Sequence, residues 1–174
     1  MNELIARCLE VSRDFAEQDS VELDLCDLLA GVAAEFAHTG VDIRGRKGPD
    51  CRLRIRPLAL RRILANLVHN AIQYTPAGGS VTIEARPVNG EVLVRVRDTG
   101  PGLSEADRAI AFSRFERGSA SANGAGLGLG LALAHEIARA HGGEIWATSE
   151  PGRGTTFVFT LPTGGRATPP RQRG

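Results

Sequence analysis

The chain has 174 residues, of which 42% are hydrophobic and 24% charged, a composition typical of one globular domain. Its 21 Lys and Arg residues nearly balance 20 Asp and Glu residues, and the net charge of +1 argues against a nucleic-acid binder. No apolar run reaches the ~18 residues of a membrane span, and the charged stretch 1–15 is not typical of a signal peptide. We therefore expect no nucleic-acid partner and no membrane contact by this segment. Three cysteines without ligand spacing are expected to be reduced thiols.

Apolar residues at spacings of three and four predict helices, and alternating apolar residues predict strands. In chain order, the first 79 residues are expected to form a helix over 4–15, a strand over 21–25, a helix over 28–36, strands over 41–43 and 52–56, and a helix over 57–74. Asp24 or Asp27 would cap the second helix, and Pro57 suits the first turn of the third.

The second half predicts a hairpin, a last helix and a final pair of strands. The expected elements are strands over 80–85 and 92–97 joined by Asn89-Gly90, a loop over 98–102, an irregular stretch over 112–126, a helix over 127–141, and strands over 144–148 and 155–161. The fold class that follows is α/β: a two-layer sandwich with helices on one face of a mixed sheet.

Asn66 and Asn70 lie four residues apart on the third main helix and therefore share a face. Two amides that project together can orient a hydrated cation or phosphate oxygens. The alternative is that they cap or bridge neighbouring loops, which is the more frequent role of an isolated pair.

Asp98 ends an apolar strand and opens the sequence Asp-Thr-Gly-Pro-Gly. A carboxylate there can accept a hydrogen bond from an exocyclic amine such as that of adenine, and Gly100 and Gly102 would let a flat ring approach the backbone. The alternative is a turn in which Asp98 bonds to its own backbone.

The glycine-rich segment Gly124–Gly130 leads directly into the last predicted helix. Backbone amides of such a loop, together with a helix N-terminus, form a phosphate site. The spacing is not that of a dinucleotide-binding fold, and the Lys-Ser/Thr of a P-loop is absent from it. The alternative is a flexible hinge.

Taken in their order along the chain, the Asn66–Asn70 pair, the Asp98 loop and the glycine-rich segment resemble the catalytic ATP-binding domain of sensor histidine kinases. This domain belongs to a superfamily that also includes DNA gyrase, a heat-shock chaperone and MutL. The similar segments cover about 24–162: the N box at 66–76, the G1 box at 98–102, the F box at 112–117, the G2 box at 126–132 and a last glycine box at 152–157. The resemblance implies a Bergerat-type fold, with a mixed, mostly antiparallel sheet and about three helices on one face.

The resemblance also implies ATP and Mg²⁺ as cofactors and a role for each matched residue. Asn70 would ligate Mg²⁺, Asn66 would support phosphate or metal, and Arg117 would begin a lid over 117–125 that Phe112 and Phe115 anchor. Catalytic roles would belong to Asn66, Asn70 and Arg117. The residues implied to bind the nucleotide are Asn66, Asn70, Tyr74, Asp98, Gly100, Gly102, Phe115, Gly126, Leu127, Gly128, Leu129, Gly130, Thr155 and Thr156.

The implied organisation has three parts: residues 1–19 as the end of a dimerisation and phosphoacceptor hairpin, residues 20–162 as the catalytic domain, and residues 163–174 as a flexible tail. None of the four histidines lies in a phosphoacceptor sequence, so we expect the acceptor histidine upstream. The implied partners are that dimerisation and phosphoacceptor domain and a response regulator. The implied location is cytoplasmic, with any membrane anchor in the upstream part.

Two departures from the family pattern bear on activity. Gln73 stands where many histidine kinases carry a cation, and a neutral amide attracts phosphate less strongly. Asn66 stands where the ATPase branch carries a glutamate, and an amide cannot act as a general base, which favours transfer to histidine over hydrolysis. The alternatives are a Ser/Thr kinase of the anti-sigma-factor type and a non-catalytic nucleotide-sensing or docking module.

Overall fold

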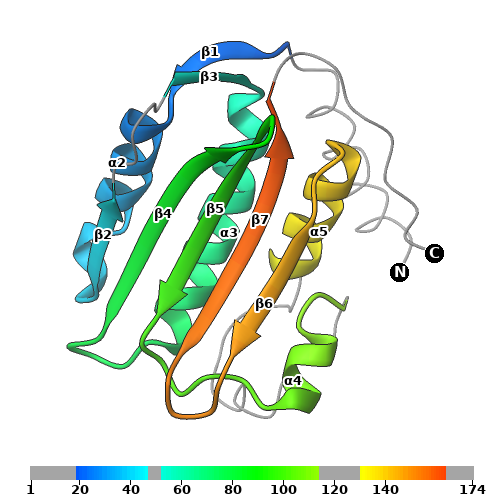
Figure 1. Cartoon of the computed structure of the whole chain (residues 1–174). Helices are drawn as coiled ribbons and strands as arrows, with labels where there is room; N and C mark the ends of the chain where they lie inside the picture. Colours follow the sequence, from blue (N-terminus) through cyan, green and yellow to red (C-terminus); the bar gives the residue numbers. More distant parts are fainter. Residues whose placement is uncertain (1–18, 47–51, 114–129, 164–174) are drawn as a thin grey trace, which may run out of the picture.

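The computed structural model describes residues 19–46, 52–113 and 130–163, which form a sheet with helices packed on one face (Figure 1). The elements are β1 (Val21–Asp24), α2 (Leu25–Glu35), the 3-10 helix η1 (Ala37–Thr39), β2 (Asp42–Arg46), β3 (Arg52–Ile55), α3 (Pro57–Tyr74), β4 (Ser80–Val88), β5 (Glu91–Asp98), α4 (Glu105–Ile110), α5 (Gly130–Ala140), β6 (Ile145–Ser149) and β7 (Thr155–Pro162). The predicted helix over 4–15 and the tail lie outside the described residues. No helix in the described ranges has both the length and the apolar character needed to cross a membrane.

The main sheet has five strands in the order β2-β4-β5-β7-β6, and a separate pair joins β1 to β3. Only β2 and β4 are parallel in the main sheet, and the other neighbours are antiparallel. Asn89 and Gly90 adopt φ values of 49° and 79° in the turn between β4 and β5, as a tight hairpin of this sequence requires. The expected two-layer sandwich with a mixed, mostly antiparallel sheet is confirmed.

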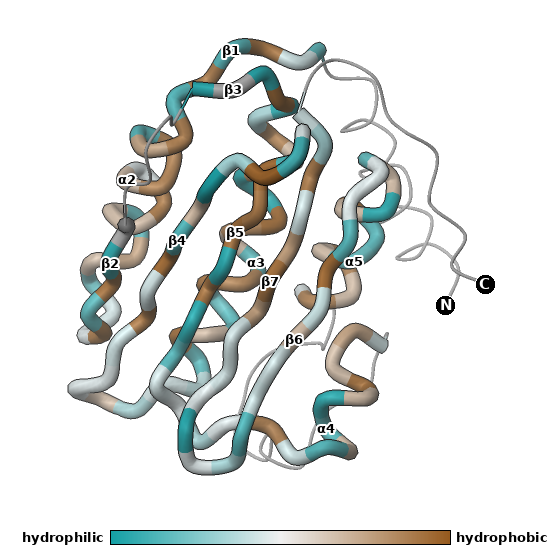
Figure 2. Tube along the Cα trace, in the orientation of Figure 1, coloured by the Kyte–Doolittle hydropathy of each residue, from teal (hydrophilic) through white to brown (hydrophobic). Residues whose placement is uncertain are grey.

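The core lies between the sheet and its helices. Seven residues of α3 are buried, because apolar side chains recur every three or four residues along it. The strands supply alternating apolar rows, seen as alternating colours along β4 and β5 in Figure 2. The largest fully buried strand side chains are Phe157, Phe159, Ile83 and Leu161. The opposite face of the sheet carries no helix among the described elements (Figure 1).

Three local features differ from the sequence prediction or refine it. Asp24 is the residue that caps α2, since its Oδ1 accepts the N–H of Cys26 at 2.8 Å, and α2 therefore begins earlier than expected. Helix α4 was not predicted, although Ser104 caps it by accepting the N–H of Asp107 at 3.1 Å. Cys26 is disulfide-bonded, contrary to the expected free thiol.

Candidate functional site

Asp98 is a buried carboxylate at the end of an otherwise apolar row. Along β5, the inward positions Val92, Val94 and Val96 are fully buried, and Asp98 continues that row with 3% of its surface exposed. In the sheet register, Asp98 lies opposite Val81 on β4. Because side chains alternate between the two faces along a strand, the charged side chain of Asp98 points toward the helix-covered face rather than toward solvent.

One oxygen of Asp98 organises the surrounding backbone. Its Oδ1 accepts the N–H of Gly100 at 2.8 Å and the N–H of Thr155 at 3.1 Å. Its Oδ2 accepts no hydrogen bond from the described residues. Burial raises the pKa of Asp98 above the ordinary carboxyl value, while the two backbone N–H groups and the nearby Arg97 oppose that shift. The site thus presents one partnered and one available carboxylate oxygen, which suits a ligand that donates a hydrogen bond.

A hydrogen-bond network fixes the loop after β5 against the turn between β6 and β7. Ser149 Oγ accepts the N–H of Leu103 at 2.7 Å, donates to the carbonyl oxygen of Gly154 at 2.9 Å, and lies 3.0 Å from the hydroxyl of Thr155. The N–H of Gly152 donates to the carbonyl oxygen of Pro101 at 2.7 Å. These hydrogen bonds join residues 101–103 to residues 149–155 and form one wall beside Asp98. Sequence reasoning missed Ser149, because a serine at a strand end carries no signal of such contacts.

Gly100 and Gly102 lie in close contact with neighbouring backbone in this wall. A Cβ on Gly100 would lie 2.7 Å from the carbonyl oxygen of Tyr74, and a Cβ on Gly102 would lie 2.3 Å from that of Glu150. Gly102 also has a φ of 76°, which disfavours other residues. The approach of neighbouring backbone already requires glycine at both positions, whether or not a ring binds here.

Helix α3 carries the amide pair and connects the Asp98 loop to α5. Asn66, Asn70 and Tyr74 repeat every four residues and are all half-buried. The backbone carbonyl oxygen of Tyr74 lies beside Gly100 in the Asp98 loop, whereas Asn66 faces the start of α5, where a Cβ on Gly130 would lie 3.5 Å from Asn66 Oδ1. At 1.5 Å per residue, this row extends for about 12 Å along the helix. These three residues therefore share one face of α3, which approaches the Asp98 loop at one end and the start of α5 at the other.

Asn66 has a buried amide nitrogen that lacks a hydrogen-bond partner among the described residues. Such a donor is costly to bury, because it loses its bonds to water without replacement. This donor lies beside Gly130, the first described residue of α5, and the N-terminal end of a helix favours an anion. Among the described residues, no group of three or more His, Cys, Asp or Glu side chains forms a metal site.

The remaining predicted residues divide into three groups. Thr155 joins Asp98, but Thr156 lies on the opposite face of the sheet, where it lines a pocket with Arg97 and Thr148. Phe112 packs on the core with its ring centroid 6.1 Å from that of Phe157. The other predicted site residues lie outside the described residues: Phe115, Arg117 and the lid over 117–125, Gly126, Leu127, Gly128 and Leu129.

The chain is similar to known proteins over most of its length. The model of the family "Histidine kinase-, DNA gyrase B-, and HSP90-like ATPase" matches residues 55–165. The adaptive-response sensory kinase SasA of Synechococcus sp. (strain JA-2-3B'a(2-13)) is 45% identical over 63% of this chain and 29% of its own length. The sensor histidine kinase component HK1 of Mycobacterium tuberculosis is 40% identical over 81% of this chain and 83% of its own length. The chain thus spans less than a third of the SasA relative and most of HK1.

Solved structures give the same result. Full-length ShkA in complex with AMPPNP superposes with a TM-score of 0.76 and 31% identity, covering 88% of this chain and 33% of that protein. The catalytic domain of the histidine kinase ThkA superposes with a TM-score of 0.71 and 27% identity, covering 83% of this chain and 96% of that domain. With its buried carboxylate, its amide row and these relatives, the chain belongs to the histidine kinase-, DNA gyrase B- and HSP90-like ATPase family, as a catalytic ATP-binding domain of the sensor histidine kinase type.

Proposed function

We propose that this domain binds Mg·ATP and transfers the γ-phosphate to a histidine of a dimerisation and phosphoacceptor hairpin, from which it passes to an aspartate of a response regulator. The observation that carries the proposal is Asp98, a buried carboxylate with one oxygen fixed by backbone N–H groups and the other available. The sensor kinases among the relatives favour histidine over serine as the acceptor. The use of ATP would place the domain in the cytoplasm.

At the base end, Asp98 Oδ2 would accept a hydrogen bond from the amino group of adenine. A buried acceptor of this kind discriminates strongly, because a base without the amino group would leave the carboxylate unpaired. Tyr74 would pack beside the base or the ribose. Thr155, whose N–H holds Asp98 Oδ1, would act as a positioning residue.

At the phosphate end, Asn66 and Asn70 would face the triphosphate from α3, and Gly130 would begin the helix whose N-terminus attracts it. Asn70 offers an amide oxygen, and Mg²⁺ prefers oxygen ligands, typically one or two from protein together with phosphate and water. The donor set therefore fits Mg²⁺, which would neutralise phosphate charge when bound. Phe115, Arg117, Gly126, Leu127, Gly128 and Leu129 remain proposed contacts from the segment outside the described residues.

The chemistry would consist of positioning for an in-line transfer. An imidazole nitrogen of the acceptor would bond to the γ-phosphorus while the bond to the bridging β,γ-oxygen breaks and ADP leaves. Asn66 cannot remove a proton from water, so its place on α3 favours transfer over hydrolysis. Bound nucleotide and acceptor orientation would then determine the rate.

Equilibrium binding of ATP, with and without Mg²⁺, tests the site. We expect the wild type to bind, Mg²⁺ to strengthen binding, and Asp98→Asn to weaken it at least tenfold, because the amide would present a donor to the adenine amino group. Asp42→Asn, which changes an exposed aspartate on β2, is the matched control and should bind as the wild type does. A folded wild type that does not bind ATP would contradict the proposal and favour a docking module.

A transfer assay with an added phosphoacceptor hairpin tests the reaction. We expect label from γ-labelled ATP on the hairpin in an acid-labile form typical of phosphohistidine. Acid-stable label on serine would instead support the anti-sigma-factor type of kinase. Release of free phosphate without label on the hairpin would show hydrolysis and contradict the role given to Asn66.

A further inference from the structure

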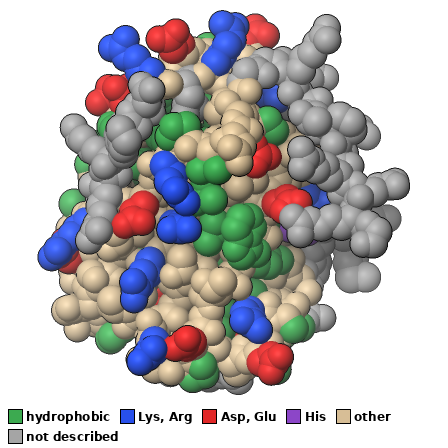
Figure 3. All heavy atoms as spheres, in the orientation of Figure 1, with side chains coloured by type: hydrophobic (Ala, Val, Ile, Leu, Met, Phe, Trp, Pro, Cys, Tyr) green, Lys and Arg blue, Asp and Glu red, His purple; other side chains and the backbone are tan. Residues whose placement is uncertain are grey.

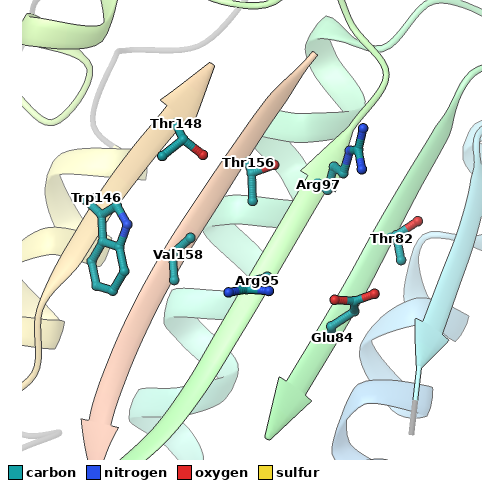
Figure 4. Close-up of a pocket in the computed structure, with 8 residues that line it drawn as sticks. All are labelled: Thr82, Glu84, Arg95, Arg97, Trp146, Thr148, Thr156 and Val158. Carbon is teal, nitrogen blue, oxygen red and sulfur yellow. The ribbon is translucent and has the colours of Figure 1, made fainter. Parts of the chain in front are cut away.

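The face of the sheet opposite the helices carries two cross-strand rows of side chains. In one row Glu84, Arg95, Val158 and Trp146 are register partners across β4, β5, β7 and β6. In the other row the partners are Thr82, Arg97, Thr156 and Thr148. These eight residues line one pocket of about 380 Å³, shown in Figure 4.

This pocket combines cationic and apolar groups. Arg95 and Arg97 are both exposed, and neither forms a salt bridge with another described residue. Trp146, with 36% of its surface exposed, stands next to the apolar floor at Val158. Figure 3 shows hydrophobic side chains gathered in the middle of this face with cationic side chains beside them. An indole beside exposed guanidinium groups is a common feature of sites that bind protein segments.

The pocket is separate from the proposed nucleotide site. Thr155 and Thr156 are consecutive residues of β7, so their side chains point to opposite faces of the sheet. The backbone of Thr155 holds Asp98, whereas Thr156 lines this pocket. The two sites share strands but not lining side chains, and Arg97 of this pocket acts on Asp98 only through its charge, which lowers the pKa of that carboxyl.

The charges favour a short acidic segment as the occupant. The two exposed arginines outnumber Glu84, the one acidic residue of the pocket, and attract carboxylates, while the net charge of +1 disfavours a nucleic acid. The C-terminal stretch 164–174 contains three arginines and no acidic residue, so it would be repelled by Arg95 and Arg97. A second copy of this face would also place like charges together.

We propose that the pocket on the helix-free face of the sheet binds an acidic peptide segment of a partner protein, with carboxylates on Arg95 and Arg97 and an apolar side chain between Trp146 and Val158. The segment would lie over β5, β7 and β6. The threonine hydroxyl groups of the second row would supply further hydrogen bonds to its polar groups. The proposal is independent of nucleotide binding.

Trp146 is the only tryptophan of the chain, so its fluorescence reports on this pocket without a label. The probe is a capped peptide in which two glutamates flank a leucine on each side, and its control has glutamine in place of glutamate. We expect a saturable shift of Trp146 emission with the acidic peptide, weakened by salt, and a much weaker response to the neutral one. Arg95→Gln and Arg97→Gln should each weaken binding about threefold to tenfold.

Three controls make the result decisive. Arg62→Gln, an exposed arginine of α3, should bind the acidic peptide as the wild type does, and Arg95→Lys should recover part of the affinity lost in Arg95→Gln. Asp98→Asn should keep peptide binding, which separates this proposal from that of the nucleotide site. Equal binding of both peptides, or equal loss in Arg62→Gln, would overturn the proposal. So would tighter binding of a single-stranded oligonucleotide, or a peptide-free emission shift that depends on protein concentration and indicates a second copy.

Discussion

Asp98 accepts the backbone N–H of Thr155 at 3.1 Å, across 57 residues of sequence, and this contact joins the end of β5 to the start of β7. The same Oδ1 accepts the N–H of Gly100 at 2.8 Å, so a single oxygen secures the loop and the neighbouring strand. Both hydrogen bonds from the backbone to this carboxylate therefore end on the same oxygen. Substitutions at this position can separate the stability of the fold from recognition of a base.

The amide and alanine variants of Asp98 are expected to behave differently. Asparagine has nearly the same shape as aspartate, so Asp98→Asn keeps an oxygen for both backbone N–H groups and removes a charge that burial disfavours. We expect its stability to equal or exceed that of the wild type while ATP affinity falls. Asp98→Ala leaves two donors unpaired, and we expect a loss of about 1–3 kcal/mol for each one that stays buried. Denaturant unfolding and calorimetric ATP titration measure both effects. Equal destabilisation in the two variants would contradict this account.

The stability of the wild type relative to Asp98→Asn should change with pH. Because the pKa of Asp98 is raised in the folded state, the folded protein holds this proton at a pH where the unfolded chain has released it. The resulting stabilisation is complete below the ordinary value of 3.8 and is lost as pH rises through the folded pKa. We expect the advantage of the asparagine variant to grow from acid toward neutral pH, measured as the difference in unfolding free energy. A difference that stays constant over this range would show that burial does not govern the titration.

Asn66→Ala is expected to weaken nucleotide binding without unfolding the domain. It removes a buried amide nitrogen that has no partner among the described residues and places a better helix former within α3. We expect the unfolding free energy to stay constant or rise by up to about 1 kcal/mol, and Mg·ATP affinity to fall at least tenfold. Arg62→Ala, at an exposed position of the same helix, is the control and should change affinity by about twofold or less. A loss of stability above about 2 kcal/mol in Asn66→Ala would indicate a structural role instead.

Gly102→Ala should destabilise the wall beside Asp98. The new Cβ would lie 2.3 Å from the carbonyl oxygen of Glu150, and the φ of 76° disfavours alanine. We expect a loss of about 2 kcal/mol or more in unfolding free energy together with weaker ATP binding. The control is Gly31→Ala in α2, where a Cβ has open space and helix propensity predicts a gain of about 0.5–1 kcal/mol. Equal effects of the two substitutions would contradict the close contact at Gly102.

His135 should make stability depend on pH in weakly acidic solution. It packs on Phe112 with 5.9 Å between ring centroids, and burial lowers its pKa below the ordinary value of 6.5, against the attraction of Glu136. Arg139 adds to the lowering. The unfolded chain therefore binds this proton more readily, and stability falls as pH decreases below 6.5. When the pH is lowered from above 6.5 to below it, we expect the unfolding free energy of His135→Gln to fall less than that of the wild type.

His38→Gln, which removes an exposed imidazole from η1, controls for a general effect of losing a histidine. Chemical denaturation at each pH gives the unfolding free energies. A dependence in His135→Gln as steep as that of the wild type would show that the acid sensitivity arises at other groups.

The sequence predicts the elements with strong periodicity and misses those determined by a single local contact. Helix α3 is confirmed over 57–74, because its apolar row and Pro57 mark both its face and its start. Helix α4 has only six residues and no long apolar row, and only the capping pair Ser104 and Asp107 marks it in the sequence. The disulfide at Cys26 depends on tertiary proximity, which spacing alone does not give.

At the site, the sequence does not give the structural reason for each residue. The assignment of Thr155 and Thr156 to one ligand conflicts with strand geometry, since consecutive residues face opposite sides, and the structure brings only Thr155 to Asp98. The requirement for glycine at position 102 comes from Glu150, whose carbonyl oxygen is brought near by the fold. Contacts between distant segments leave no periodic trace, so sequence patterns cannot separate them from contacts with a ligand.

The position of β7 between β5 and β6 determines when the domain can be completed during synthesis on the ribosome. Strands β4 and β5 can pair as a hairpin as soon as they emerge, but β6 has no partner in the described sheet until β7 follows. The same late strand supplies Phe157 and Phe159 to the core and the N–H that fixes Asp98. A nascent chain that has reached Glu150 therefore already contains Asp98 and Tyr74, the groups proposed to contact adenine, but lacks the strand that holds Asp98 in place. We therefore expect nucleotide binding to begin only after the last strand has been synthesised.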